Sequence, residues 1–271
     1  VKERNLPHMA TNPAADAVHG VASTVIAFIA LHRIEPMRGW QMLALAAGER
    51  LLQLRHRNPN NERSWAGQQL SLGGFGSSGI ALALTRLYEL TQDFRFLRAV
   101  YDIVQQQDKH YDEAHGGWAD IRQQPPTYPL TWCHGTLGPG MVRLVLQSHE
   151  QNGRPSPQLR ALLEGIDHTE MHEGDGLCCG MSGNIDMLLS VSREFHQPSY
   201  AERANYWLTQ MITRAHDRGG YVTASGFPGL YQQPALMQGS AGIAYQIARC
   251  AYPRIFPSLL WYGLPRPHEP T

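Results

Sequence analysis

The segment Leu177-Cys178-Cys179-Gly180-Met181-Ser182-Gly183-Asn184 has the form Cys-X-Gly-X-X-Gly, and Trp132-Cys133-His134-Gly135-Thr136-Leu137-Gly138 repeats that form. Three of the four cysteines of the chain lie in these two segments. Each segment is followed by an apolar run with few charges, which is typical of a buried helix. The two segments therefore indicate one structural position that occurs twice and carries thiols.

The Gly-X-X-Gly pattern belongs to an internal repeat of the whole chain. Five segments begin with it, or with Gly-X-X-Ser, and their first glycines are 45 to 59 residues apart: Gly20, Gly76, Gly135, Gly180 and Gly239. Each precedes an apolar stretch that we predict to be a buried helix, at residues 24–34, 80–90, 139–150, 184–195 and 243–252. A unit that recurs at this spacing indicates a repeat fold.

More amphipathic segments separate the apolar ones and predict helices with one solvated face, at residues 40–56, 94–110, 158–171 and 200–216. Ser156 before Pro157 indicates a helix start, and Ser199 with Glu202 indicates a capping box. Strand signals are weak apart from residues 220–224 and scattered loop pieces. The alternation of inner and outer helices predicts an all-α fold, an α/α toroid that forms a single domain over residues 1–271.

The overall composition excludes several classes of partner. Twenty-three basic residues balance 23 acidic ones, so nothing indicates a nucleic-acid partner. No apolar run reaches the roughly 18 residues that span a bilayer, and the first residues lack the pattern of a secretion signal. Four cysteines are few for a disulfide scaffold. Because adjacent cysteines favour reduced thiols, we expect a cytoplasmic protein whose cysteines bind metal or act in catalysis.

Superposition of the repeats predicts which residues share one rim of the toroid. The residues two positions before the first glycines are Val18, Gly74, Cys133, Cys178 and Met237. The residues one position before them are His19, Phe75, His134, Cys179 and Gln238. Three thiols should therefore converge, which predicts a catalytic zinc site with an open fourth position. His134 is the competing candidate for a ligand position.

These motifs resemble the lanthionine synthetase C-like family, most closely the cyclase domain at the C-terminus of class II lanthipeptide synthetases. The resemblance rests on the two cysteine segments and on segments 76–84, 236–244 and 256–260, so it spans nearly the whole chain. It implies a toroid of seven helical hairpins, of which five are visible. We expect the first two hairpins to be absent, together with the dehydratase domain that precedes the cyclase in the fused enzymes.

The resemblance also implies a cofactor and a reaction. The implied zinc ligands are Cys133, Cys178 and Cys179, with Cys179 in the place of a more usual histidine. The reaction adds a Cys thiol of a dehydrated precursor peptide to dehydroalanine or dehydrobutyrine, which gives lanthionine or methyllanthionine. Because three cysteinates leave the zinc complex one charge more negative than a site with two cysteines and a histidine, we expect a more reactive bound thiolate.

One family position differs in this chain. Phe75 stands where the family normally has a histidine, a candidate acid that protonates the enolate, and Phe75 cannot transfer protons. Asp16 matches a family aspartate. We therefore take Asp16, His134 and His19 as candidate catalytic residues, with the two histidines as alternative proton donors. Phe75 also favours a second hypothesis, a zinc-containing peptide-binding module that no longer catalyses.

A third hypothesis is a hydrolase of the glycosidase kind on an α/α toroid. That chemistry needs two carboxylates across a cleft. The loops offer Asp16, Asp120 and Asp175 for this purpose. The hypothesis leaves the three thiols without a role and ranks below the other two.

Overall fold

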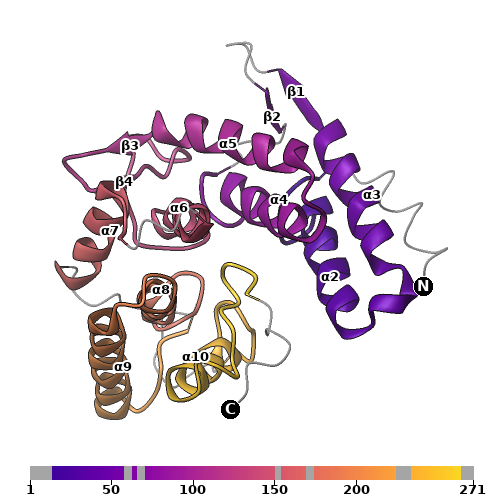
Figure 1. Cartoon of the computed structure of the whole chain (residues 1–271). Coiled ribbons are helices and arrows are strands. Elements are labelled where there is room, and N and C mark those ends of the chain that lie inside the picture. Colours follow the sequence, from indigo (N-terminus) through magenta and orange to yellow (C-terminus); the bar gives the residue numbers. More distant parts are fainter. Residues whose placement is uncertain are drawn as a thin grey trace.

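The computed structural model of the chain describes residues 14–57, 63–65, 71–149, 154–168, 174–223 and 233–263. Within these residues the chain is mostly helical, with two short antiparallel hairpins. Five helices form an inner layer and four form an outer layer in this part of the chain (Figure 1). The predicted all-α fold class is therefore confirmed. No helix among the described residues is long and apolar enough to cross a membrane.

The inner helices begin one or two residues after the first glycine of each repeat. They are α2 (Val21–Ile34), α4 (Ser77–Thr91), α6 (Leu137–His149), α8 (Met181–Glu194) and α10 (Ser240–Ala251). Each starts two or three residues earlier than predicted, because the residues that follow the first glycine already form its first turn. Glycine is required before α6, since a side chain at Gly135 would collide with the carbonyl oxygen of Pro129.

Successive inner helices pack against one another, and an outer helix follows each of the first four. The outer helices are α3 (Trp40–Gln53), α5 (Phe94–Asp108), α7 (Pro157–His168) and α9 (Pro198–Arg218), with a short 3-10 helix η1 (Pro36–Arg38) before α3. Contacts run from α2 to α4, α6, α8 and α10 in turn, and each outer helix contacts the inner helix before it. Figure 1 shows the resulting arc, with the outer helices on its convex side.

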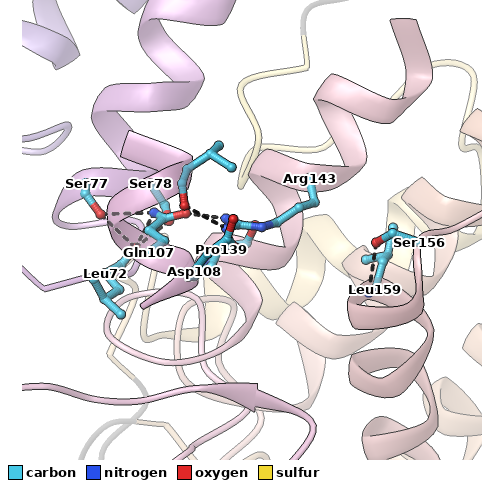
Figure 2. Close-up of polar contacts among 10 residues, drawn as sticks. Leu72, Ser77, Ser78, Gln107, Asp108, Pro139, Arg143, Ser156 and Leu159 are labelled. Carbon is cyan, nitrogen blue, oxygen red and sulfur yellow. Dashed lines mark hydrogen bonds and ion pairs between the residues drawn. The ribbon is translucent and has the colours of Figure 1, made fainter. Parts of the chain in front are cut away.

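The starts of two outer helices test the predicted caps. The Ser156 hydroxyl accepts the N–H of Leu159 at 3.2 Å, so the predicted cap of α7 is confirmed (Figure 2). The predicted capping box of α9 is wrong, because the helix begins at Pro198 and its N-cap is Gln197. Proline is pre-organised for the first helical position, and this preference outweighs the Ser199 pattern one residue later.

Two hairpins lie outside the predicted pattern. β1 (Arg55–Arg57) pairs with β2 (Arg63–Trp65), and β3 (Tyr111–Asp112) pairs with β4 (Gly117–Trp118). Residues 221–223 form no strand, contrary to prediction, and residue 224 lies outside the described residues. The backbone of this segment bonds to Asp175 instead. The N–H of Val222 donates to the Asp175 carboxylate, and the carbonyl oxygen of Val222 accepts the N–H of Asp175, both at 2.8 Å.

A buried polar network fixes the loop that leads into α4 (Figure 2). Arg143 of α6 donates to the side chain of Gln107 and, at 2.5 Å, to the carboxylate of Asp108 at the end of α5. Gln107 in turn donates to the Ser78 hydroxyl at 2.9 Å and to the Leu72 carbonyl oxygen at 3.3 Å. The turn before α4 is thereby held against two neighbouring helices.

Candidate metal centre

The turns that precede the inner helices lie side by side and are joined by backbone hydrogen bonds. The N–H of Gly74 donates to the carbonyl oxygen of Trp132 at 2.7 Å, and the N–H of Trp132 donates to the carbonyl oxygen of Cys178 at 2.8 Å. The N–H of Cys178 donates to the carbonyl oxygen of Met237 at 2.9 Å. Each bond joins equivalent turns of successive repeats, so these four turns share one rim, as the repeat alignment predicts.

Three thiols meet on this rim. The Cys179 sulfur lies 2.9 Å from the Cys133 sulfur and 2.8 Å from the Cys178 sulfur. All three sulfurs lie within 4.8 Å of one another. They are free thiols, at separations well beyond the roughly 2.05 Å of a disulfide bond. The predicted convergence of the three cysteines is confirmed, and together they can hold a metal ion.

The three thiols share their protons unequally. Hydrogen bonds from Cys178 and Cys179 lower the pKa of Cys133 to about 3, which favours a thiolate within the group. Hydrogen bonding to that thiolate raises the pKa of Cys178 and raises the pKa of Cys179 to about 11. The hydrogen bonds within the cluster, more than repulsion between like charges, thus favour one thiolate and two thiols. A bound divalent cation would displace the remaining protons.

This donor set fits zinc. Thiolates are soft ligands that zinc prefers, and zinc takes four ligands in a tetrahedral arrangement. Cys133 and Cys178 are buried, whereas Cys179 is more exposed. Three protein sulfurs, one of them on the more open side, leave a fourth position for an external ligand.

Phe75 and His134 lie on the same rim as the thiols. Phe75 packs edge-on against Trp132, with ring centroids 5.5 Å apart, and edge-on against His134 at 5.4 Å. Burial lowers the pKa of His134, while the charge of Cys133 raises it in part. The His134 Nδ1 atom is buried and has no hydrogen-bond partner in the described part of the chain. His134 thus carries an imidazole nitrogen without a partner among the described residues, next to a thiol-bearing residue.

Asp16 and His19 lie together at the turn before α2. The Asp16 carboxylate accepts the N–H of Val18 at 2.8 Å and the N–H of His19 at 2.7 Å. The His19 imidazole lies 3.8 Å from the same carboxylate, and the His19 side chain is 85% exposed. These contacts are those of a capped turn, and the group of three thiols includes neither residue. The catalytic roles of Asp16 and His19 stay predictions.

Arg122 is a residue near the thiols that the sequence analysis did not assign to the site. It donates to the buried Asp120 carboxylate through two guanidinium nitrogens, at 2.9 and 2.7 Å. The hydrogen bond to Asp120 raises the pKa of Arg122 most, and the negative charge of the thiol cluster raises it further. Arg122 therefore supplies positive charge to the surroundings of the thiolates. An Asp-X-Arg sequence in a loop is too common to indicate this placement.

Comparison with known proteins agrees with the helical repeat and the thiol-bearing rim. The family model described as lanthionine synthetase C-like protein matches residues 4–261, and the chain belongs to this family. A curated relative, the lacticin 481/lactococcin biosynthesis protein LcnDR2 of Lactococcus lactis subsp. lactis, is 23% identical over 194 residues. The match covers 64% of this chain and 20% of that protein, so the chain spans about a fifth of the length of this relative.

Proposed function

We propose that this chain is a zinc-dependent peptide cyclase that forms lanthionine and methyllanthionine thioether rings in lanthipeptide biosynthesis. The observation that carries the proposal is the convergence of three free thiols on one rim of a lanthionine synthetase C-like fold. The relative described as a lacticin 481/lactococcin biosynthesis protein supports a peptide substrate. A dehydratase, fused or separate, would supply the dehydrated peptide, and a reducing cytoplasm would keep the thiols free.

In this proposal Cys133, Cys178 and Cys179 hold zinc, which when bound lowers the pKa of the substrate thiol and keeps it nucleophilic at neutral pH. The substrate sulfur then bonds to the β-carbon of the dehydro residue, and the resulting enolate takes one proton at its α-carbon. His134 is the residue we assign to that proton transfer, because its imidazole lies on the rim next to Cys133, where Phe75 contacts it and cannot transfer a proton itself. Arg122 offsets the negative charge that accumulates beside the thiolates.

The peptide-binding module without catalysis is the alternative. Phe75 supports it, because this side chain fills the rim position with aromatic contacts to Trp132 and His134 and has no proton to transfer. In that alternative the thiols would still hold zinc, and the peptide would bind without ring closure.

The glycosidase hypothesis finds no support in the carboxylates that it needs. Asp120 is bonded to Arg122, and Asp175 is bonded to Arg214 at 2.5 Å and is buried. Both carboxylates are therefore held by arginines inside the fold. Asp16 caps its own turn.

The test is ring closure on a synthetic peptide with one Cys and one dehydroalanine. The proposal expects loss of the free thiol without a change of mass, since addition moves atoms within one molecule. Cys133→Ala should abolish thiol loss, whereas Cys250→Ala, which removes the free cysteine of α10 outside the cluster, should retain it. Thiol loss no faster than in buffer alone would contradict the cyclase and leave the peptide-binding module.

A further inference from the structure

The β1–β2 hairpin and α5 lie at the outer side of the arc (Figure 1), and residues of both line a cationic pocket. Its volume is about 630 Å³. The cations that line it are Arg55, Arg57, Arg63, Arg95, Arg98 and Lys109. Asp102 is the carboxylate that the described residues add to this lining, beside Gln105 and Gln106. The proposed chemistry of the thiol cluster makes no use of this pocket.

The register of the hairpin gathers three arginines on one face. Arg57 lies directly opposite Arg63 in the antiparallel pair, and Arg55 lies opposite Trp65. Because side chains alternate along a strand, Arg55, Arg57 and Arg63 all face the pocket. Like charges directly opposite each other destabilise a strand pair. Arg57 and Arg63 therefore bring two positive charges together on the side of the hairpin that lines the pocket.

Helix α5 presents a matching polar stripe. Arg95, Arg98, Asp102, Gln105 and Lys109 follow one another at intervals of three or four residues and so lie along one face of the helix. At 1.5 Å per residue the stripe is roughly 21 Å long. The lining of the pocket, which we refer to as the groove, thus follows α5 over a length that suits about six residues of extended chain at roughly 3.3 Å each.

Part of the positive charge in the groove is already compensated within the fold. Arg55 pairs with Asp102, and Arg95 pairs with two carboxylates of its own. Arg63 and Arg98 are exposed, and their guanidinium groups form no ion pair with the described residues. One of these two arginines lies on the hairpin and the other lies on α5, and both line the groove.

We propose that this groove binds an acidic stretch of the peptide substrate, extended and outside the segment that reacts at the thiols. The inference rests on the proposed function for the identity of the peptide. Guanidinium groups bind carboxylates through paired hydrogen bonds. The amide of Gln105 can bond to a peptide backbone, whereas that of Gln106 already donates to the carbonyl oxygen of Arg63 at 2.7 Å. A compact phosphate would reach only part of the cationic stripe, which favours an extended chain as the ligand.

Fluorescence anisotropy with a labelled octapeptide of alternating Glu and Gly tests the groove, with the Gln–Gly peptide as the neutral probe. We expect the acidic peptide to bind about tenfold more tightly than the neutral one, and less tightly as salt is added. The variant Arg63→Glu/Arg98→Glu should lose about tenfold in affinity. Arg254→Glu, which reverses an exposed arginine after α10, is the matched control and should bind like wild type.

Equal binding of the two peptides by wild type would overturn the proposal, and so would unchanged affinity in the double variant. Circular dichroism shows whether that variant is folded, and Arg63→Gln and Arg98→Gln replace it if it is not. Tighter binding of tripolyphosphate than of the acidic peptide would also overturn it, in favour of a phosphate ligand.

A cyclisation assay on the same sample separates this inference from the proposed function. Thiol loss without binding of the acidic peptide would contradict the groove alone. Binding of the acidic peptide without any thiol loss would contradict the proposed function, and with it the identification of the ligand as a cyclisation substrate.

Discussion

The backbone N–H of Trp132 donates to the carbonyl oxygen of Cys178 at 2.8 Å, and this bond joins the turns of two successive repeats. It brings Cys133 beside Cys179 although 46 residues separate them in the sequence. The bond is made by main-chain atoms, so replacement of a cysteine side chain leaves it in place. The thiol cluster is therefore a consequence of how the repeats pack, and its ligands can be varied one at a time.

The first prediction concerns the charge of the metal centre. Cys179→His should keep zinc bound and slow ring closure several-fold, because a neutral ligand makes the bound thiolate less electron-rich and less nucleophilic. The measurement is the single-turnover rate of thiol loss at matched zinc content. An unchanged or faster rate would show that the third thiolate does not activate the substrate.

The second prediction concerns the proton donor. His134→Gln should lower kcat about 100-fold, the lower range for loss of a general acid or base, while the zinc content stays the same. His19→Gln is the comparison, because His19 lies at the exposed turn before α2. A loss of kcat at His19 with none at His134 would place the proton donor at that turn instead.

A third prediction follows from the pKa of Asp120. The hydrogen bond from the Arg122 side chain lowers this pKa below its usual value. Because the folded-state pKa is the lower one, the pair stabilises the fold above about pH 4 and loses that effect as the pH falls through the folded value. Asp120→Asn should therefore lower the free energy of unfolding by about 1–3 kcal/mol at pH 7.

Urea unfolding of wild type and Asp120→Asn at pH 7 and at pH 3 checks this prediction. The difference in free energy of unfolding between the two proteins should shrink at the lower pH. A difference of the same size at both pH values would mean that the lost interaction does not depend on the charge of Asp120.

The fourth prediction concerns the segment after α10. The buried Trp132 indole donates to the carbonyl oxygen of Leu260 at 2.8 Å, which ties that segment to the rim. Trp40 is also buried, but its indole nitrogen has no hydrogen-bond partner in the described residues. Trp132→Phe should therefore lower the free energy of unfolding by about 1 kcal/mol more than Trp40→Phe does. Equal losses in thermal or urea unfolding would show that the bond contributes nothing.

The helices and the thiol cluster could be predicted from the sequence because both depend on local patterns that repeat. Each Gly-X-X-Gly segment reports the turn before an inner helix, and equivalent turns must lie at one rim once the helices stack. Cys133 and Cys178 are placed together by that logic without knowledge of any contact. The position of a residue within its repeat therefore predicts which rim of the fold it lies on, and a single sequence is enough to determine that position.

The features that escaped prediction depend on contacts between loops. The β1 segment Arg55-His56-Arg57 has no alternation of apolar and polar residues, so nothing in it indicates a strand. Contacts with α5 hold the hairpin, since Arg55 pairs with Asp102 and Gln106 donates to the carbonyl oxygen of Arg63. Arg122 reaches the surroundings of the thiols because the long loop before α6 folds back, which residue spacing does not encode. The start of α9 was predicted two residues too late, because Pro198 is preferred at the first helical position over Ser199 as the N-cap.

The most direct test of the metal centre is the zinc content of purified wild type, Cys133→Ala and Cys250→Ala, measured by plasma mass spectrometry after dialysis. The account predicts about one zinc per chain in wild type and in Cys250→Ala, and loss of zinc in Cys133→Ala with the helical circular dichroism spectrum retained. Wild type that binds no zinc after reconstitution, or Cys133→Ala that keeps a full equivalent, would contradict it.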